Sequence, residues 1–218
     1  MTTLNINTDA LVAAIKRVFP HAAVPSANTP VLECIRFETR AGYLIVSATD
    51  RFTMIESRVM LSEEDAALPP VSFLVNGKQL KAILPAFKAS PVVSIEPGVT
   101  NASGATFNGA FVPGDTGNYP ATDRLWPDTF DALSSANIAL GVENVKKLAA
   151  LPQGRHEKGT PLVFGQADAN GDGNKPVIVL FAEHTRVLVM PVRNNGFTAG
   201  RWADWSKPSI TAPVSAAA

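Results

Sequence analysis

The sequence Ser47-Ala48-Thr49-Asp50-Arg51-Phe52-Thr53-Met54 places a polar Thr-Asp corner between two stretches in which apolar and polar residues alternate. Alternation with a period of two is typical of a half-buried β-strand. The pattern therefore predicts one strand over 43–48, a turn at Asp50-Arg51 and a second strand over 53–61. Another strand is predicted before them, over 31–39, after a loop rich in Pro, Ser and Asn.

The residues before this hairpin predict a short strand over 4–6 and a helix over 8–19. Thr8 is the expected N-cap, and Pro20 stops the helix because proline lacks the N–H that a helix interior needs. The apolar residues recur at the spacing of one helix face, at Leu11, Ala14, Ile15 and Val18. The first unit of the chain is thus a strand, a helix and three strands.

The same order of elements recurs twice farther along the chain. The second unit is predicted as a strand over 71–75, a helix over 76–88 capped by Asn76, and strands over 92–96 and 105–112. The third unit is predicted as a strand over 137–141, a helix over 142–151, and strands over 161–166, 176–183 and 186–192. In the third helix we expect Val145, Leu148 and Ala149 to face inward.

Proline and turn residues between 113 and 135 indicate irregular structure. We therefore expect a first domain over 1–115 with two units, a linker over 116–136, and a second, shortened domain over 137–193. Residues 194–218, with Trp202 and Trp205, are expected to form a C-terminal tail. The fold class is α+β, and on this pattern alone any α+β protein with three helices would fit.

The composition is that of a folded protein. Hydrophobic residues make up 46% of the 218 residues and charged residues 17%, and the formal net charge is zero. The whole molecule is therefore not an obvious polyanion binder. The single cysteine, Cys34, excludes an internal disulfide framework and a multi-cysteine metal site. The sequence shows no signal peptide and no apolar run of membrane-spanning length, so we expect a cytoplasmic protein.

Enzyme signatures are missing from the sequence. The three histidines, His21, His156 and His184, are scattered, and H-E-x-x-H, Walker A and G-x-S-x-G motifs do not occur. The stretch 168–173 mimics part of a calcium loop but lacks the distal Glu, so it predicts a turn. A metal-dependent nuclease would need clustered carboxylates, which are also missing. We expect no enzymatic activity, no metal and no cofactor.

Three stretches resemble the bacterial sliding clamp, the β subunit of DNA polymerase III. Leu32 to Thr39 followed by Ser47 to Phe52 resembles its middle domain, where a strand with Phe-Glu precedes Ala-Thr-Asp-Gly-His-Arg-Leu. Asn118 to Leu125 resembles the link between the middle and last domains, and Leu188 to Arg193 resembles the end of the clamp chain. Here Arg51-Phe52-Thr53-Met54 replaces Gly-His-Arg-Leu. The resemblance implies the DNA-clamp fold, in which repeated units line a ring with helices and place antiparallel sheets outside.

In that family the three stretches converge on a groove that binds short peptides of polymerases and of the clamp loader. Carried over by position, the resemblance implies a partner-peptide groove formed by Leu32, Thr49, Met54, Pro120, Arg124, Leu125, Leu188 and Met190. Methionine suits such a groove because it adapts to varied partners. Without the resemblance, Met54, Leu188 and Met190 would be interpreted as core residues of strands. The altered corner at 51–54 leaves the peptide specificity open.

The three predicted helices carry seven basic and two acidic residues, a net charge of +5 in a chain whose total is zero. Basic helices on a more acidic body suit a ring around DNA, because phosphates attract the lining without sequence readout. The expected DNA-facing residues are Lys16, Arg17, Lys78, Lys81, Lys88, Lys146 and Lys147. The alternative is that these side chains only solvate the outer faces of the helices.

A cellular clamp has six units per chain and closes as a dimer, whereas about three units are predicted here. We expect three or four copies to close a homo-oligomeric ring through head-to-tail contacts. The expected function is that of a processivity factor that encircles double-stranded DNA, tethers the replicative polymerase and is placed on DNA by a clamp loader. The alternative is a clamp-like monomer that binds peptides and modulates a host clamp or polymerase without encircling DNA.

Overall fold

The structure is a computed structural model that describes residues 2–25, 29–98, 104–126, 131–132, 140–153, 157–166 and 176–191. The helices are α1 (Thr8–Val18), α2 (Glu63–Ala66), α3 (Gly77–Phe87) and α4 (Val142–Ala149), with 3-10 turns η1 (Phe19–His21), η2 (Pro30–Glu33) and η3 (Thr122–Leu125). The strands are β1 (Leu4–Asn7), β2 (Cys34–Arg40), β3 (Tyr43–Thr49), β4 (Thr53–Met60), β5 (Ser72–Asn76), β6 (Val92–Pro97), β7 (Gly104–Phe107), β8 (Ala110–Pro113), β9 (Asp131–Ala132), β10 (Leu162–Gln166), β11 (Val177–Phe181) and β12 (Thr185–Val189).

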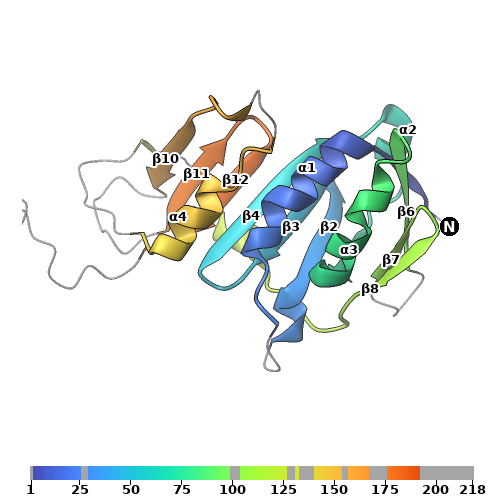
Figure 1. Cartoon of the computed structure of the whole chain (residues 1–218), viewed down its shortest axis with the longest axis horizontal. Helices are drawn as coiled ribbons and strands as arrows, with labels where there is room; N and C mark the ends of the chain where they lie inside the picture. The colour runs from blue at the N-terminus through green and yellow to red at the C-terminus, as the bar shows by residue number, and fades with distance from the viewer. Residues whose placement is uncertain are drawn as a thin grey trace, which may run out of the picture.

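The strands form two antiparallel sheets. One has four strands in the order β1-β6-β7-β8, and the other has eight in the order β5-β2-β3-β4-β12-β11-β10-β9. Helices α1, α3 and α4 lie on one face of these sheets, and the opposite face of the large sheet is its outer face (Figure 1). Within the described ranges, none of the helices is long and apolar enough to cross a bilayer.

The first two units exchange their first strands. Strand β1 pairs with β6 of the second unit, in the register Leu4↔Ile95, while β5 pairs with β2 of the first unit, in the register Val75↔Ile35. Each sheet therefore depends on both units. Their shared core contains Phe37, which stacks on Phe73 at 5.2 Å and meets Phe107 edge-on at 5.8 Å between ring centroids.

The third unit continues the large sheet through β4 and β12. These strands pair over five residues, from Thr185↔Ser57 to Val189↔Thr53. Strand β9 then pairs with β10 of its own unit. This position next to β10 corresponds to the one that β5 fills next to β2, so the third unit supplies its own edge strand where the first two exchange theirs.

The apolar face predicted for the first helix is confirmed, since Leu11, Ala14, Ile15 and Val18 are all buried. Its cap was predicted wrongly. The N-cap is Asn7, whose side chain accepts from Ala10 N at 3.0 Å, whereas the Thr8 hydroxyl donates to the Ser90 carbonyl at 2.6 Å. Asn76 caps α3 as predicted, by accepting from Gln79 N at 3.1 Å.

The predicted single strand over 105–112 is instead the hairpin of β7 and β8. Asn108 and Gly109 form its turn with φ of 47° and 84°. Two central residues with positive φ are typical of the turn that Asn-Gly prefers between antiparallel strands. The second unit therefore has three strands after its helix, like the first.

The third unit differs from its prediction in two respects. Strand β9 lies at Asp131–Ala132, inside the stretch expected to be linker, while 137–139 of the predicted strand lie outside the described residues. In α4 only Leu148 of the three expected inward residues is buried, and Val145 is 48% exposed. On this helix Lys147 points back toward the first unit, as described below.

Candidate functional site

The Thr-Asp corner between β3 and β4 is held by its own side chains. The Thr49 hydroxyl donates to the Thr53 carbonyl at 2.8 Å and accepts from Arg51 N at 3.2 Å. Asp50 Oδ1 accepts from Phe52 N at 3.1 Å and from Thr53 N at 2.8 Å. Arg51 takes a positive φ of 79°, a conformation uncommon outside glycine. The corner is therefore rigid, and it presents Phe52, which is 65% exposed.

The same corner contacts α4 of the third unit. Lys147 forms an ion pair with Asp50 Oδ2 and lies 3.4 Å from the Thr53 hydroxyl. Burial alone would raise the pKa of Asp50, but hydrogen bonds from Lys147 and the Thr53 backbone outweigh it and lower the pKa below its ordinary value of 3.8. Asp50 is therefore a charged partner that joins the first and third units.

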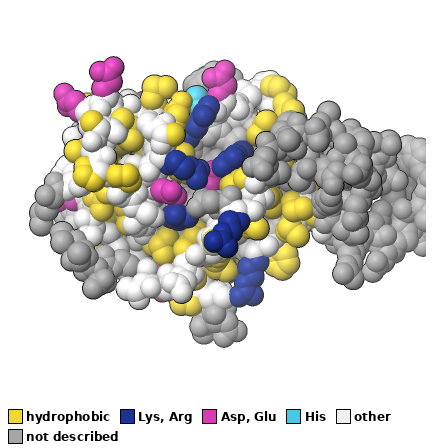
Figure 2. Space-filling model, turned by 180° about the vertical axis from the view of Figure 1, so that it is seen from behind, with side chains coloured by type: hydrophobic (Ala, Val, Ile, Leu, Met, Phe, Trp, Pro, Cys, Tyr) yellow, Lys and Arg dark blue, Asp and Glu magenta, His cyan; other side chains and the backbone are white. Residues whose placement is uncertain are grey.

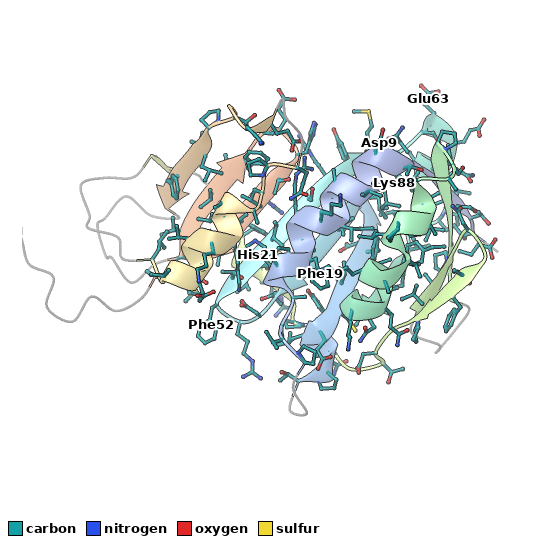
Figure 3. All side chains as sticks on the ribbon, in the orientation of Figure 1. Asp9, Phe19, His21, Phe52, Glu63 and Lys88 are labelled. Carbon is teal, nitrogen blue, oxygen red and sulfur yellow. The ribbon has the colours of Figure 1, made fainter. Side chains whose placement is uncertain are left out.

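A second contact joins α1 to the third unit. The Arg17 side chain donates to the Leu151 carbonyl at 3.3 Å and forms an ion pair with Glu157, while its guanidinium lies 5.9 Å from the centre of the Phe181 ring. His21 lies near this junction, at the end of α1 that faces α4 (Figure 3). It is fully buried, and burial, reinforced by Lys147, lowers its pKa to about 3. The imidazole is therefore neutral near pH 7.

The residues expected to form the peptide groove separate into buried and exposed ones. Met54 and Leu188 lie directly opposite each other across β4 and β12, but they are only 2% and 4% exposed. Leu32 and Thr49 are buried as well. The exposed members are Pro120, Arg124, Leu125 and Met190. The β4–β12 junction thus brings together the expected floor, although that floor is covered.

Two exposed apolar side chains lie at the end of the β4–β12 junction where Thr53 pairs with Val189. Met190 N donates to the Phe52 carbonyl at 2.8 Å, so the chain that leaves β12 runs beside the corner. Met190 is 40% exposed, and Phe52 points away from the corner (Figure 3). Phe52 was not among the expected groove residues. The sequence feature that could have indicated Phe52 is the replacement of Gly-His-Arg-Leu by Arg51-Phe52-Thr53-Met54, because it puts an aromatic side chain at a turn.

The cover over the outer face of the large sheet is the segment 114–126. Tyr119 lies over β2, with its ring 6.0 Å from the Arg36 guanidinium. Trp126 donates from Nε1 to Glu56 on β4 at 3.0 Å, and its ring lies 4.0 Å from the Arg186 guanidinium on β12. The described part of the linker expected over 116–136 therefore crosses strands of the large sheet and is fixed at the junction by Trp126.

The expected DNA-facing residues also separate into two groups. Lys16, Lys78, Lys81, Lys88 and Lys146 are exposed on the three helices. Arg17 is only 6% exposed and is therefore interior, contrary to expectation. Lys147 is paired with Asp50, and its side chain is only 18% exposed. Sequence spacing could not distinguish these two, because their acidic partners lie on other elements.

The described residues contain no group of three or more His, Cys, Asp or Glu side chains that could hold a metal ion. The calcium-like turn over 168–173, His156, Val192, Arg193 and the tail with Trp202 and Trp205 lie outside the described residues.

Repeated units with antiparallel sheets on one side and helices on the other define the DNA-clamp fold, and this chain has that fold. A sliding clamp from Bacillus subtilis superposes with a TM-score of 0.64 at 15% identity, covering 88% of this chain and 64% of that one. A DNA polymerase III subunit beta from Borrelia burgdorferi gives 0.67 at 12% identity, covering 93% and 67%. A Helicobacter pylori clamp, solved with a DNA ligase peptide, gives 0.63 at 10% identity, covering 91% and 69%.

The chain thus spans about two thirds of the length of these clamps. No protein-family model matches its sequence, and no curated protein does either. The common fold is therefore carried by buried patterns and topology rather than by sequence identity.

We expect Asp50→Asn to reduce the free energy of unfolding by about 1–2 kcal/mol at neutral pH, because it removes a charge-assisted bond to Lys147. Since folding lowers the pKa of Asp50, its contribution is complete above 3.8 and is lost as the pH falls through the folded-state value. Denaturant unfolding of both proteins across the acid range measures this difference. It should shrink toward low pH, and a pH-independent difference would contradict the pairing. Glu64→Gln, at an exposed carboxylate on α2, is the control.

Proposed function

We propose that this protein is a DNA sliding clamp, a processivity factor that surrounds duplex DNA and tethers a polymerase without catalysing a reaction. The observation that carries the proposal is the layer of α1, α3 and α4 on one face of the sheets, because five of its lysines are exposed. Phosphates attract such a surface without base contacts, and contacts of this kind let a protein slide.

The proposed ring is made of several copies. The described residues contain three units per chain, so four copies would supply the twelve units that two six-unit chains provide. Three copies would require a fourth unit from residues outside the described ranges. Loading such a ring onto DNA calls for a clamp loader, and the ring would act where DNA is replicated, in the cytoplasm of a bacterial or phage-infected cell.

A monomeric peptide-binding protein is the second candidate function, because the proposed groove lies within a single chain. Light scattering across a dilution series separates the two candidates. We expect a constant mass of three or four chains, since a ring that holds DNA has to stay closed on dilution. A single-chain mass at every concentration would overturn the ring and favour the monomeric protein that modulates a host clamp or polymerase.

We expect the double variant Lys16→Glu, Lys88→Glu to weaken binding to a short labelled DNA duplex. The slope of log K against log salt should fall by about 0.9 for each DNA phosphate that the variant no longer neutralises. Fluorescence anisotropy titrations over a range of salt concentrations give this slope. Arg58→Glu, on the outer face, is the charge-reversal control and should leave the slope unchanged. An equal decrease in the control would show that the helices do not line the DNA path.

The groove proposed for polymerase peptides is formed by the expected residues Leu32, Thr49, Met54, Pro120, Arg124, Leu125, Leu188 and Met190, with Phe52 added at its edge. Its support is the β4–β12 pairing, which places Met54 beside Leu188 and Met190 beside Phe52. The Helicobacter pylori clamp was solved with a bound peptide, which makes peptide capture a reasonable use of the same fold. Because Met54 is only 2% exposed, an inserting peptide has to displace neighbouring side chains to reach it.

We expect Met190→Ala to weaken binding of a fluorescein-labelled peptide from a bacterial replicative polymerase by about tenfold, since the variant loses most of an apolar side chain at the contact. Anisotropy titration measures the affinity. Met60→Ala is the matched control, because Met60 is 72% exposed at the other end of β4. Undiminished affinity of Met190→Ala, or an equal weakening in the control, would remove Met190 from the groove.

A further inference from the structure

The outer face of the large sheet has a hollow of about 540 Å³ at the junction of the first and third units. Its floor is formed by β3, β4, β11 and β12, and its ends by the β2–β3 and β11–β12 turns. Lys and Arg side chains gather in the middle of this face (Figure 2). The hollow lies on the face opposite the helices, so it has no part in the proposed contact with DNA.

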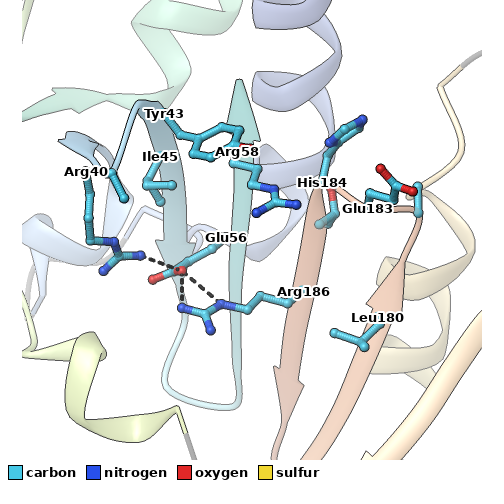
Figure 4. A pocket seen from close by; sticks show the side chains of 12 residues that line it. Arg40, Tyr43, Ile45, Glu56, Arg58, Leu180, Glu183, His184 and Arg186 are labelled. Carbon is cyan, nitrogen blue, oxygen red and sulfur yellow. Dashed lines mark hydrogen bonds and ion pairs between the residues drawn. The ribbon is translucent and has the colours of Figure 1, made fainter. Parts of the chain in front are cut away.

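One end of the hollow holds a carboxylate that is already fully engaged. Glu56 is 6% exposed, and its Oε2 accepts from Arg40 at 3.0 Å and from Arg186 Nη2 at 2.7 Å and Nε at 3.0 Å (Figure 4). Its other oxygen accepts from Trp126 at 3.0 Å. Two guanidinium groups on one carboxylate leave a positive excess at this end.

The other end of the hollow holds Arg58. Its guanidinium lies 4.7 Å from the centre of the Tyr43 ring, and its backbone N donates to the His184 carbonyl at 2.8 Å (Figure 4). Arg58 is exposed, and in the described part of the chain no carboxylate lies within ion-pair distance of it. Stacking on Tyr43 holds the guanidinium in place, so its donors are pre-organised for an incoming anion.

The charges that line the hollow limit the charge of the anion that it can bind. Arg40, Arg58 and Arg186 contribute three positive charges, and Glu56 and Glu183 contribute two negative ones. These five groups sum to a net charge of +1, which matches a single anionic group. The uncharged part of the lining includes Ile45 and Leu180. Such a site accepts one carboxylate that has apolar neighbours.

Nucleic acid fits the hollow less well than a carboxylate does. A base would need a free aromatic face to stack on, but Arg58 covers the ring of Tyr43 and Arg186 covers that of Trp126. A phosphate backbone would also bring several charges close to Glu56 and Glu183, which the net charge of +1 does not compensate.

We propose that this hollow binds an acidic side chain of a partner protein, with its carboxylate on Arg58 and its flanking apolar side chains on Ile45 and Leu180. The hollow is distinct from the proposed polymerase-peptide groove. It lies beside Glu56, Arg58 and the β11–β12 turn, whereas the groove lies at the Thr53 and Val189 ends of the same strands. Trp126, Glu56 and Arg186 separate the two.

The test uses a labelled, acetylated and amidated peptide with the sequence Gly-Leu-Glu-Leu-Gly and its counterpart with Gln in place of Glu. We expect the Glu peptide to bind the full chain about tenfold more tightly than the Gln peptide, because only a carboxylate makes the charge-assisted bond. Arg58→Gln should abolish this preference, and Arg58→Lys should retain part of it, since lysine keeps the charge but not the planar fork.

Lys158→Gln, an exposed charge removal between α4 and β10, is the matched control and should keep the full preference. Circular dichroism and thermal unfolding check that the Arg58 variants remain folded. Equal affinity for the two peptides, or an unchanged preference in Arg58→Gln, would overturn the proposal. It would also be overturned if a single-stranded oligothymidylate displaced the Glu peptide and bound in an Arg58-dependent manner, because the site would then recognise nucleic acid.

Discussion

The backbone pairing of β4 with β12 is the constraint on which the rest of this structure depends. Five residue pairs make one eight-stranded sheet out of segments from opposite ends of the chain. On the helix side, Asp50 with Lys147 and Arg17 with Glu157 fasten the same junction. On the outer side it is fastened by Trp126, Glu56 and Arg186. Side chains therefore fix the relative position of the units on both faces of the sheet.

The two faces of the junction use positive charge differently. On the helices, Lys16, Lys78 and Lys88 are exposed, long side chains, a form suited to weak contacts with any phosphate. Lys81 lies 4.3 Å from the centre of the Phe19 ring, and Lys146 pairs with Glu143. On the outer face, the guanidinium groups of Arg58 and Arg186 lie over aromatic rings, and Arg186 is also fixed by Glu56. Such fixed guanidinium groups discriminate by geometry. The net charge of zero does not show this difference, because it is a sum over the whole chain and not over each face.

The sequence predicted those features that depend on neighbours within one element. The stripe of α1 and the cap of α3 are local, and both are present. Arg17 and Lys147 were expected to be free to face DNA, but they form ion pairs with Glu157 and Asp50, which are remote in sequence. The predicted inward face of α4 was wrong at Val145 and Ala149, which are exposed, whereas Lys147 pairs with the distant Asp50. The Asn108-Gly109 turn was a local signal, and it was overlooked inside an apolar run.

The resemblance to sliding clamps gave the overall arrangement, which the solved clamps of the same fold confirm. It could not reveal that the segment 114–126 lies over the outer face of the sheet, or that Met54 and Leu188 are buried. Trp126 attaches this segment to the sheet through partners on β4 and β12. The partners of Trp126 are Glu56 on β4 and Arg186 on β12. These strands become neighbours only when the sheet forms, so the sequence alone could not indicate this contact.

The exchange of first strands between the first two units also limits how early β1 can fold while the chain is being synthesised. Strand β1 leaves the ribosome before the other described strands, yet its partner β6 is made only after both helices α1 and α3. Until then its backbone groups have no partner, and the chain has to close a long loop to satisfy them. Its brevity, four residues with polar Asn5 and Asn7 alternating with Leu4 and Ile6, makes it a poor template for pairing with other nascent chains.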